Sequence, residues 1–169
     1  SVIVQEYSGP LYSLARNFGR SLEDAEEDVQ EIFLNVYRAL SRFDLSRQFR
    51  PWVFQIAVNH LKSARRRRVR RLSRAELVAT DHDVLEELAS DSSRPPDHLA
   101  LERLADEDVM QALDALPRKW RDAFVLRQMQ GLSGSEAAQI LEVPEETVRT
   151  HLFRARQELQ NQMKSRGWS

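Results

Sequence analysis

The fold is decided by the stretch Gly131-Leu-Ser-Gly-Ser-Glu-Ala-Ala-Gln-Ile-Leu-Glu-Val-Pro-Glu-Glu-Thr-Val-Arg-Thr-His-Leu-Phe-Arg-Ala-Arg156. Its pattern predicts two helices joined by a tight turn. Ser133, followed three residues later by Glu136, has the spacing of a capping box at the start of the first helix. Pro144 cannot continue that helix but suits the start of a second one. This arrangement is typical of a helix-turn-helix, whose second helix lies in a DNA major groove.

The second helix is expected to run from Glu145 to about Asn161. On a helical wheel its apolar residues form one narrow stripe that must face a core: Val148, Leu152, Ala155 and Leu159. The opposite side carries Glu146, Arg149, Thr150, Phe153, Arg154 and Gln157. Arginine can bond guanine edges or phosphate, and threonine or phenylalanine can meet a thymine methyl group. The alternative is an ordinary amphipathic bundle helix whose charges are merely solvated.

Composition restricts the class of protein. The chain has 169 residues, 41% hydrophobic and 30% charged, which suits soluble globular structure in one or two small domains. It has no cysteine, no apolar run of membrane-spanning length and no signal peptide at its start, so a cytoplasmic location without membrane insertion is expected. No phosphate loop, dinucleotide fingerprint or serine-centred elbow occurs, and neither a cofactor nor catalytic residues are expected.

Charge is segregated along the chain although the net charge is only −1. Residues 1–74 carry 14 basic and 8 acidic side chains, residues 75–100 carry 1 and 7, and residues 101–169 carry 10 and 11. Such segregation implies partners of both signs. We therefore predict an all-α protein with two small helical domains, 1–74 and 101–169, joined by an acidic flexible linker, 75–100.

Helical spacing fills both predicted domains. One helix covers Leu11–Phe18 and begins earlier, and a second, capped by Ser21 with Asp24, runs to about Phe43. A third opens at Pro51 and reaches about Arg71. Helices resume near Leu99, and a further one is expected at about Arg118–Met129. The expected core positions are Leu22, Ala25, Val29, Ile32, Val36 and Leu40 in the second helix, then Leu101, Leu104, Ala112, Leu113 and Leu116.

The end of the third helix is strongly basic. It carries Lys62, Arg65, Arg66, Arg67, Arg68, Arg70, Arg71 and Arg74. One or two cations would complement the helix dipole, but this number favours a polyanionic partner. Aromatic residues lie just upstream: Phe43, Phe49, Trp52 and Phe54. Trp52 and Phe54 are expected in the core, whereas Phe43 and Phe49 could equally stack on single-stranded bases.

The acidic run from Glu23 to Asp28, with Glu31, suggests a metal site as an alternative, because two-metal nucleases need convergent carboxylates. These acids are spread around a helix start, where capping and the helix dipole explain them. The four histidines show no ligand spacing. We expect no metal.

Two segments in each half carry a resemblance to a known family. Asp24–Leu40 and Phe49–Asn59 resemble region two of bacterial ECF (extracytoplasmic function) sigma factors. Ala115–Arg127 and Gly131–Arg156 are similar to region four of the same family. The order of the segments, with a linker between them, also fits. The resemblance implies an alternative sigma factor that binds RNA polymerase core enzyme and promoter DNA, held inactive by an anti-sigma factor that is often membrane-anchored.

The resemblance also implies sites on this chain. Core polymerase would be bound by Asp24, Glu27, Gln30, Glu31, Asn35 and Arg38. The −10 element would be melted and captured by Phe43, Ser46, Arg47, Phe49, Asn59, Lys62, Ser63 and Arg66. The −35 duplex would be read by Glu146, Arg149, Thr150, His151, Phe153 and Arg154. The acidic linker would thread the transcript channel of the polymerase.

The chain departs from the family pattern at three positions. Asp28 stands where the family usually has an apolar residue, so local packing is expected to differ. Glu142 replaces the usual turn glycine, and a left-handed backbone there would cost ~1 kcal/mol. His151 replaces a frequent arginine, which bears on promoter specificity. Family members also usually begin further upstream than Ser1.

The main alternative is a stand-alone helix-turn-helix activator of the response-regulator output type. Such a protein would bind duplex DNA as a dimer and would not need the aromatic and basic first half. A metal-dependent nuclease is a third class. Binding to isolated core polymerase would separate the sigma factor from both.

Overall fold

The computed structural model describes the backbone of residues 1–76 and 100–167, and within these ranges every regular element is helical. The elements are α1 (Val2–Asn17), α2 (Leu22–Leu40), α3 (Phe49–Glu76), α5 (Ala100–Asp114), α6 (Arg118–Phe124), η2 (Val125–Met129), α7 (Gly134–Leu141) and α8 (Glu145–Ser165). The predicted all-α class is confirmed. Most of the expected acidic linker lies outside the described residues, as do the side chains of Leu101 and Leu104.

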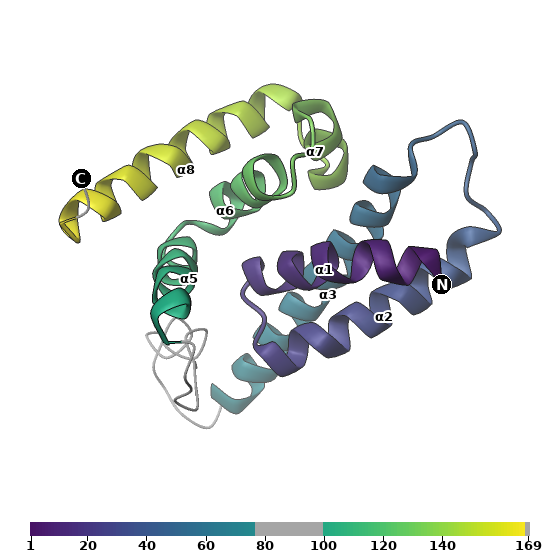
Figure 1. Cartoon of the computed structure of the whole chain (residues 1–169), viewed down its shortest axis with the longest axis horizontal. Helices are drawn as coiled ribbons and strands as arrows, with labels where there is room; N and C mark the ends of the chain where they lie inside the picture. The colour runs from purple at the N-terminus through teal and green to yellow at the C-terminus, as the bar shows by residue number, and fades with distance from the viewer. Residues whose placement is uncertain (77–99, 168–169) are drawn as a thin grey trace.

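Helices α1, α2 and α3 form a bundle (Figure 1). Ser21 begins α2 as expected, since its hydroxyl accepts a hydrogen bond from the backbone N–H of Asp24 at 3.1 Å. The bundle core includes Leu11 and Leu14 of α1, Ile32 of α2 and Phe54 of α3, all fully buried. This packing fixes the rotation of α2 and α3 and so decides which of their faces meet solvent.

Some sequence expectations for this bundle were wrong in detail. Leu22 and Leu40 are 48% and 36% exposed. They are the first and last residues of α2, where the helix extends past the buried core. Phe33, which was not expected there, is buried. Helix α2 ends at Leu40 rather than Phe43. Helix α3 begins at Phe49, ahead of Pro51, and continues to Glu76.

Helices α5 to α8 form the second half, in which α6 and α7 pack against α8. Leu113 and Leu116 are buried with Ala155 of α8, as expected. The helix predicted over Arg118–Met129 ends at Phe124, and its last five residues form the π-helix η2 instead. There the N–H of Gln130 donates to the carbonyl of Val125 at 3.0 Å, the five-residue spacing of a π-turn.

The helix-turn-helix forms as the sequence predicts. The Ser133–Glu136 capping box is complete, since the Ser133 hydroxyl accepts from the Glu136 N–H at 3.0 Å and a Glu136 carboxylate oxygen accepts from the Ser133 N–H at 2.9 Å. Helix α8 starts at Glu145, directly after Pro144, and buries Val148, Leu152 and Ala155. The core stripe of α8 is therefore confirmed.

The turn between α7 and α8 holds Glu142 in a left-handed conformation, with φ 58° and ψ 43°. Glutamate pays a steric cost there that glycine does not. Glu142→Gly is therefore expected to raise the free energy of unfolding by about 0.5–1 kcal/mol, measured by urea denaturation. The same exchange at Glu31, exposed inside α2, should instead lower it by about 1 kcal/mol. A loss of stability at Glu142 would show that its side chain has a stabilising role.

Candidate nucleic-acid interface

The outer face of α8 is open to solvent. The structure leaves Glu146, Arg149, Thr150, Phe153 and Arg154 exposed and His151 half-buried. Phe153 is 58% exposed, an unfavourable place for a large ring unless a partner covers it. The Thr150 hydroxyl donates to the backbone carbonyl of Glu146 at 3.1 Å, which leaves its methyl group for an apolar contact. Cations, a methyl group and a ring together suit a base-reading surface.

A half-buried aromatic cluster lies at the start of α3. Ring centroids are 5.4 Å apart for Phe43 and Phe49, 4.6 Å for Phe43 and Trp52, and 5.6 Å for Phe49 and Trp52. Phe54 is fully buried, as expected, and Trp52 is half-buried and packs against the core cluster. Helix α3 begins at Phe49, so Phe49 and Trp52 lie one turn apart on the same side. Bases stack on aromatic rings that are not fully buried, so three half-buried rings in mutual contact suit such a role.

The connection before α3 is held by Asp44. Its carboxylate accepts hydrogen bonds from the backbone N–H of Ser46 at 2.9 Å and from the Ser46 hydroxyl at 2.7 Å. These bonds, from the Ser46 backbone first, hold the pKa of Asp44 below its ordinary value. Ser46 and Arg47 remain exposed beside the aromatic cluster. The turn therefore fixes the backbone at a place where polar side chains meet solvent.

One face of α3 carries Asn59, Lys62, Ser63 and Arg66, at three- and four-residue spacing. Asn59 and Arg66 are exposed, Lys62 and Ser63 are half-buried, and Arg66 donates to the Ser63 hydroxyl at 3.2 Å. Arg65 does not belong to this basic surface. Its guanidinium points to the second half and pairs with Asp122 at 3.2 Å.

Helix α2 presents a polar stripe on its solvent side. Glu27, Gln30, Glu31 and Arg38 are exposed, and Asp24 and Asn35 are half-buried. Leu34 and Tyr37, which the sequence reasoning did not select, are 47% and 45% exposed beside this stripe. Neither residue belongs to the core-facing stripe of α2, and this spacing in the sequence could have predicted their exposure. This face of α2 therefore combines charged, polar and exposed apolar side chains.

Asp28 is buried between the α1–α2 connection and α3. One carboxylate oxygen accepts from Arg20 Nε at 2.6 Å, and the other lies 2.9 Å from His60 Nε2. Burial alone would raise the pKa of Asp28, but the hydrogen bonds from His60 and Arg20 outweigh burial and hold the pKa below its ordinary value. Local packing at Asp28 was expected to differ from the family, and the difference is a buried ionic cluster with Arg20 and His60 in place of an apolar contact.

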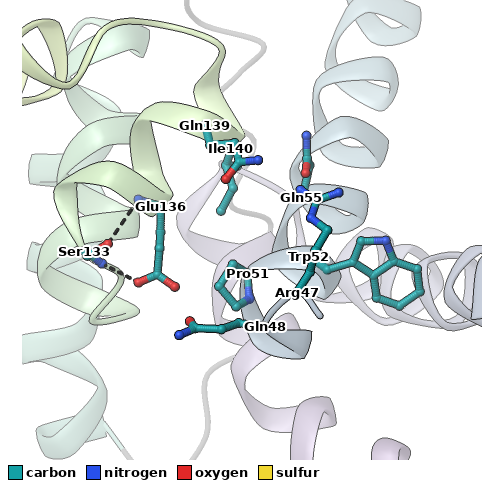
Figure 2. Close-up of a pocket in the computed structure, with 9 residues that line it drawn as sticks. All are labelled: Arg47, Gln48, Pro51, Trp52, Gln55, Ser133, Glu136, Gln139 and Ile140. Atoms are coloured by element: carbon teal, nitrogen blue, oxygen red, sulfur yellow. Dashed lines mark hydrogen bonds between the residues drawn. The ribbon is translucent and has the colours of Figure 1, made fainter. Parts of the chain in front are cut away.

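A cavity of about 540 Å³ lies between the start of α3 and the first helix of the helix-turn-helix, α7 (Figure 2). Figure 2 shows Gln48 and Pro51 on one side facing Glu136 and Ser133 on the other. The complete lining is Arg47, Gln48, Pro51, Trp52, Gln55, Ser133, Glu136, Gln139 and Ile140. The −10 and −35 candidate surfaces are therefore attached to elements that adjoin one another.

Within the described residues, no group of three or more His, Asp or Glu side chains converges as a metal site would require. Among the same residues, no helix is both long and apolar enough to cross a bilayer.

A helix-turn-helix with an exposed reading face, joined to a bundle that combines aromatic rings with a basic helix, defines a two-part nucleic-acid-binding protein. Comparison with known families makes this specific. The family model for sigma-70 region 2 matches residues 3–71, and the model for sigma-70 region 4 matches residues 106–159.

Curated relatives agree with the family models. The chain is 32% identical to the ECF RNA polymerase sigma-E factor of Escherichia coli K12, covering 96% of this chain and 85% of the relative. It is 31% identical to the RNA polymerase sigma-H factor of Pseudomonas aeruginosa, covering 92% and 81%. The chain therefore belongs to the ECF group of sigma-70 factors. It is an alternative sigma factor, a non-enzymatic initiation factor, and the activator and nuclease alternatives are set aside.

Solved structures show the same fold. The structure of CnrH in complex with the cytosolic domain of CnrY matches with a TM-score of 0.71 and 26% identity, covering 96% of this chain and 86% of CnrH. The sigma factor RpoE in complex with the anti-sigma factor NepR from Bartonella quintana matches with a TM-score of 0.77 and 24% identity, covering 95% and 94%.

Proposed function

We propose that the two halves of this sigma factor divide promoter recognition between them. Residues 1–74 bind core polymerase and the −10 element, residues 101–169 read the −35 element, and the acidic segment 75–100 follows the transcript channel. The ranges matched by the region 2 and region 4 models support these boundaries. The −6 charge of the segment supports its role, because it would lie on a path built for RNA.

One observation supports the −10 assignment above all. The aromatic cluster lies at the start of α3, and the same helix carries a polar, basic face further along. Phe49 and Trp52 lie in the first turn of α3, in contact with Phe43 from the preceding connection. The polar face of the same helix then carries Asn59, Lys62, Ser63 and Arg66. A base unstacked from the duplex would be captured at the rings, with Ser46 and Arg47 beside it. The strand would then continue along the polar face, where cations hold its phosphates.

Core polymerase binds, in this proposal, to the solvent side of α2. Asp24, Glu27 and Glu31 supply negative charge, with Gln30, Asn35 and Arg38 for hydrogen bonding. Leu34 and Tyr37 add apolar area among them. Apolar residues surrounded by polar ones are the usual arrangement of a protein interface.

An anti-sigma factor is the proposed regulator. The similar protein CnrH is solved with the cytosolic domain of CnrY, and the fold-level match RpoE is solved with the anti-sigma factor NepR. The mention of a cytosolic domain implies that CnrY also has a part outside the cytosol. A membrane-anchored regulator that binds a cytoplasmic sigma factor would have this organisation.

Promoter melting tests the −10 assignment. Asn59→Ala and Lys62→Ala should leave core binding intact but reduce open-complex formation on duplex promoters, because each removes a group that holds the opened strand. For Lys62, loss of a charged contact should cost about 1–3 kcal/mol, or roughly 5- to 150-fold. Permanganate reactivity of −10 thymines in the reconstituted holoenzyme measures the open fraction.

The matched control for charge is Arg71→Ala. Arg71 is exposed on α3 but lies about 180° around the helix from Lys62, nine residues away. A template already melted at the −10 element should restore part of the Lys62→Ala loss, because its opening cost is removed. Equal thymine reactivity in wild type and both variants would remove these residues from the melting site.

A further inference from the structure

Tyr7 of α1 joins the aromatic cluster at the start of α3 from the core side. Tyr7 is only 6% exposed, and its ring meets the ring of Phe49 edge-on, with centroids 5.8 Å apart and an interplanar angle of 76°. Phe49 in turn contacts the half-buried rings of Phe43 and Trp52. The cluster therefore runs from one ring buried in the bundle to three rings that reach the surface.

Phe49 depends on other elements for the orientation of its ring. A long side chain in a helix lies back over the preceding turn. Phe49 is the first residue of α3, so no turn of its own helix precedes it. Among the rings that contact Phe49 in the described residues, only that of Tyr7 is buried in the bundle core. Tyr7 is therefore the fixed side of the cluster.

The backbone at the start of α3 is held separately from this contact. The guanidinium carbon of Arg50 lies 4.9 Å from the centre of the fully buried ring of Phe54. The turn before α3 is held by the hydrogen bonds between Asp44 and Ser46. Loss of the Tyr7 ring should therefore free the ring of Phe49 rather than the backbone that carries it.

The contact uses the ring of Tyr7 and not a charge. Burial raises the pKa of Tyr7, and the nearby carboxylate of Glu6 raises it further, against a smaller opposing effect of Arg50. The phenol is therefore neutral at physiological pH. Edge-to-face contact between neutral rings depends on the ring itself, which phenylalanine also supplies.

We propose that Tyr7 is a positioning residue for −10 recognition, which holds Phe49, and through it the neighbouring rings, in the orientation that receives an unstacked base. The proposal rests on the assignment of the −10 element to the aromatic cluster. A base gains more from rings that are already in place, because side chains that must be ordered on binding cost conformational entropy. Helix α1 thus contributes to promoter opening through a residue that does not itself reach the DNA.

Two substitutions of Tyr7 separate its ring from its hydroxyl group. Tyr7→Leu removes the ring and keeps an apolar side chain, whereas Tyr7→Phe keeps the ring. The matched control is Tyr12→Leu, because Tyr12 is a half-buried aromatic residue of α1 that packs against the same core, and its ring makes none of the ring contacts found in the aromatic cluster. Circular dichroism and urea unfolding of each variant define the temperature at which all are folded.

Base capture is measured in the reconstituted holoenzyme with the single-stranded non-template −10 segment, in which 2-aminopurine replaces each base in turn. Its fluorescence falls when the base stacks on an aromatic ring. Tyr7→Leu should weaken binding of this strand by roughly 2- to 12-fold, the range of an aromatic pair, and should change the fluorescence of the bound strand at saturation. Tyr7→Phe and Tyr12→Leu should match wild type, and binding to core polymerase should not change.

The fluorescence at saturation distinguishes positioning from a loss of stability, since a less stable but correctly arranged cluster would stack the bound base as wild type does. Unchanged fluorescence in Tyr7→Leu at every position would overturn the proposal. An equal change in Tyr12→Leu would also overturn it, because any loosening of the bundle would then have the same effect.

A double-mutant cycle with Phe49→Leu tests whether Tyr7 acts through Phe49. If it does, Tyr7→Leu should weaken strand binding by less than about 2-fold once the Phe49 ring is absent. Independent, multiplying losses would overturn this route. Failure of the −10 assignment itself is read from Phe49→Leu alone. If that variant captures every base as wild type does, the assignment fails. If it loses capture while Tyr7→Leu does not, only the positioning role fails.

Discussion

Asp28→Ala is expected to lower the free energy of unfolding by about 3–5 kcal/mol. Asp28 is the only carboxylate within hydrogen-bond distance of Arg20 Nε and His60 Nε2 among the described contacts, and their side chains are 14% and 10% exposed. Truncation would leave a buried guanidinium without its anion and a buried imidazole without its partner. It would also remove the polar contact between Asp28 and His60 that links α2 to α3 beside their shared core.

Urea denaturation at neutral pH measures the effect. Asp24→Ala is the matched control, because Asp24 also faces Arg20 but at 4.0 Å and with a side chain 47% exposed. Surface pairs of this kind contribute about 0–1 kcal/mol. If the two variants lose equal stability, Asp28 is not the anchor of the cluster.

The same cluster predicts a pH dependence. Because the folded pKa of Asp28 lies below its unfolded value of about 4, its contribution to stability is fully present above that pH. It is lost as the pH falls through the lower folded pKa. Wild-type unfolding free energy should therefore drop in acid, and Asp28→Asn should flatten this part of the curve. An identical acid profile for both proteins would contradict the ionic role.

Local patterns made much of the fold predictable. The Ser133–Glu136 capping box, the break at Pro144 and the buried stripe of α8 each depend on residues within a few positions of one another, and all three were confirmed. The resemblance marked Glu142 as the place of the family's turn glycine, and the backbone there is left-handed. Exposure of Arg149, Phe153 and Arg154 followed from the helical period alone.

Contacts between distant residues could not be predicted in this way. Asp28 meets His60 across 32 positions, Arg65 meets Asp122 across 57, and Arg121 meets Asn17 across 104. In the sequence, Asp28 is one acid of an acidic run and Arg65 one cation of a basic run. Which charged side chain of each run is buried, and which are exposed to solvent, depends on how the helix is rotated in the folded protein. No particular residue type in the sequence marks the π-turn after Phe124. A continuous α-helix over Arg118–Met129 was therefore expected.

Arg149→Ala and Arg154→Ala are each expected to weaken −35 recognition by about 1–3 kcal/mol, or roughly 5- to 150-fold, if they contact base edges. Both guanidinium groups project from the exposed face of α8, next to the 58% exposed ring of Phe153. A bidentate bond to guanine has no substitute once the side chain is truncated. The loss should appear in the reconstituted holoenzyme as altered discrimination between promoter variants.

Lys164→Ala provides the matched control, because Lys164 is an exposed cation of α8 that lies about 22 Å beyond Arg149 along the helix. Its removal should leave promoter discrimination unchanged. An arginine that contacts only phosphate gives a different result. Its loss should weaken binding to all promoters alike, and it should lower the slope of log affinity against log salt concentration by about 1. Competition of promoter variants for the holoenzyme, repeated at several salt concentrations, separates these cases. If both arginine variants initiate normally at every promoter, the outer face of α8 does not read the −35 element.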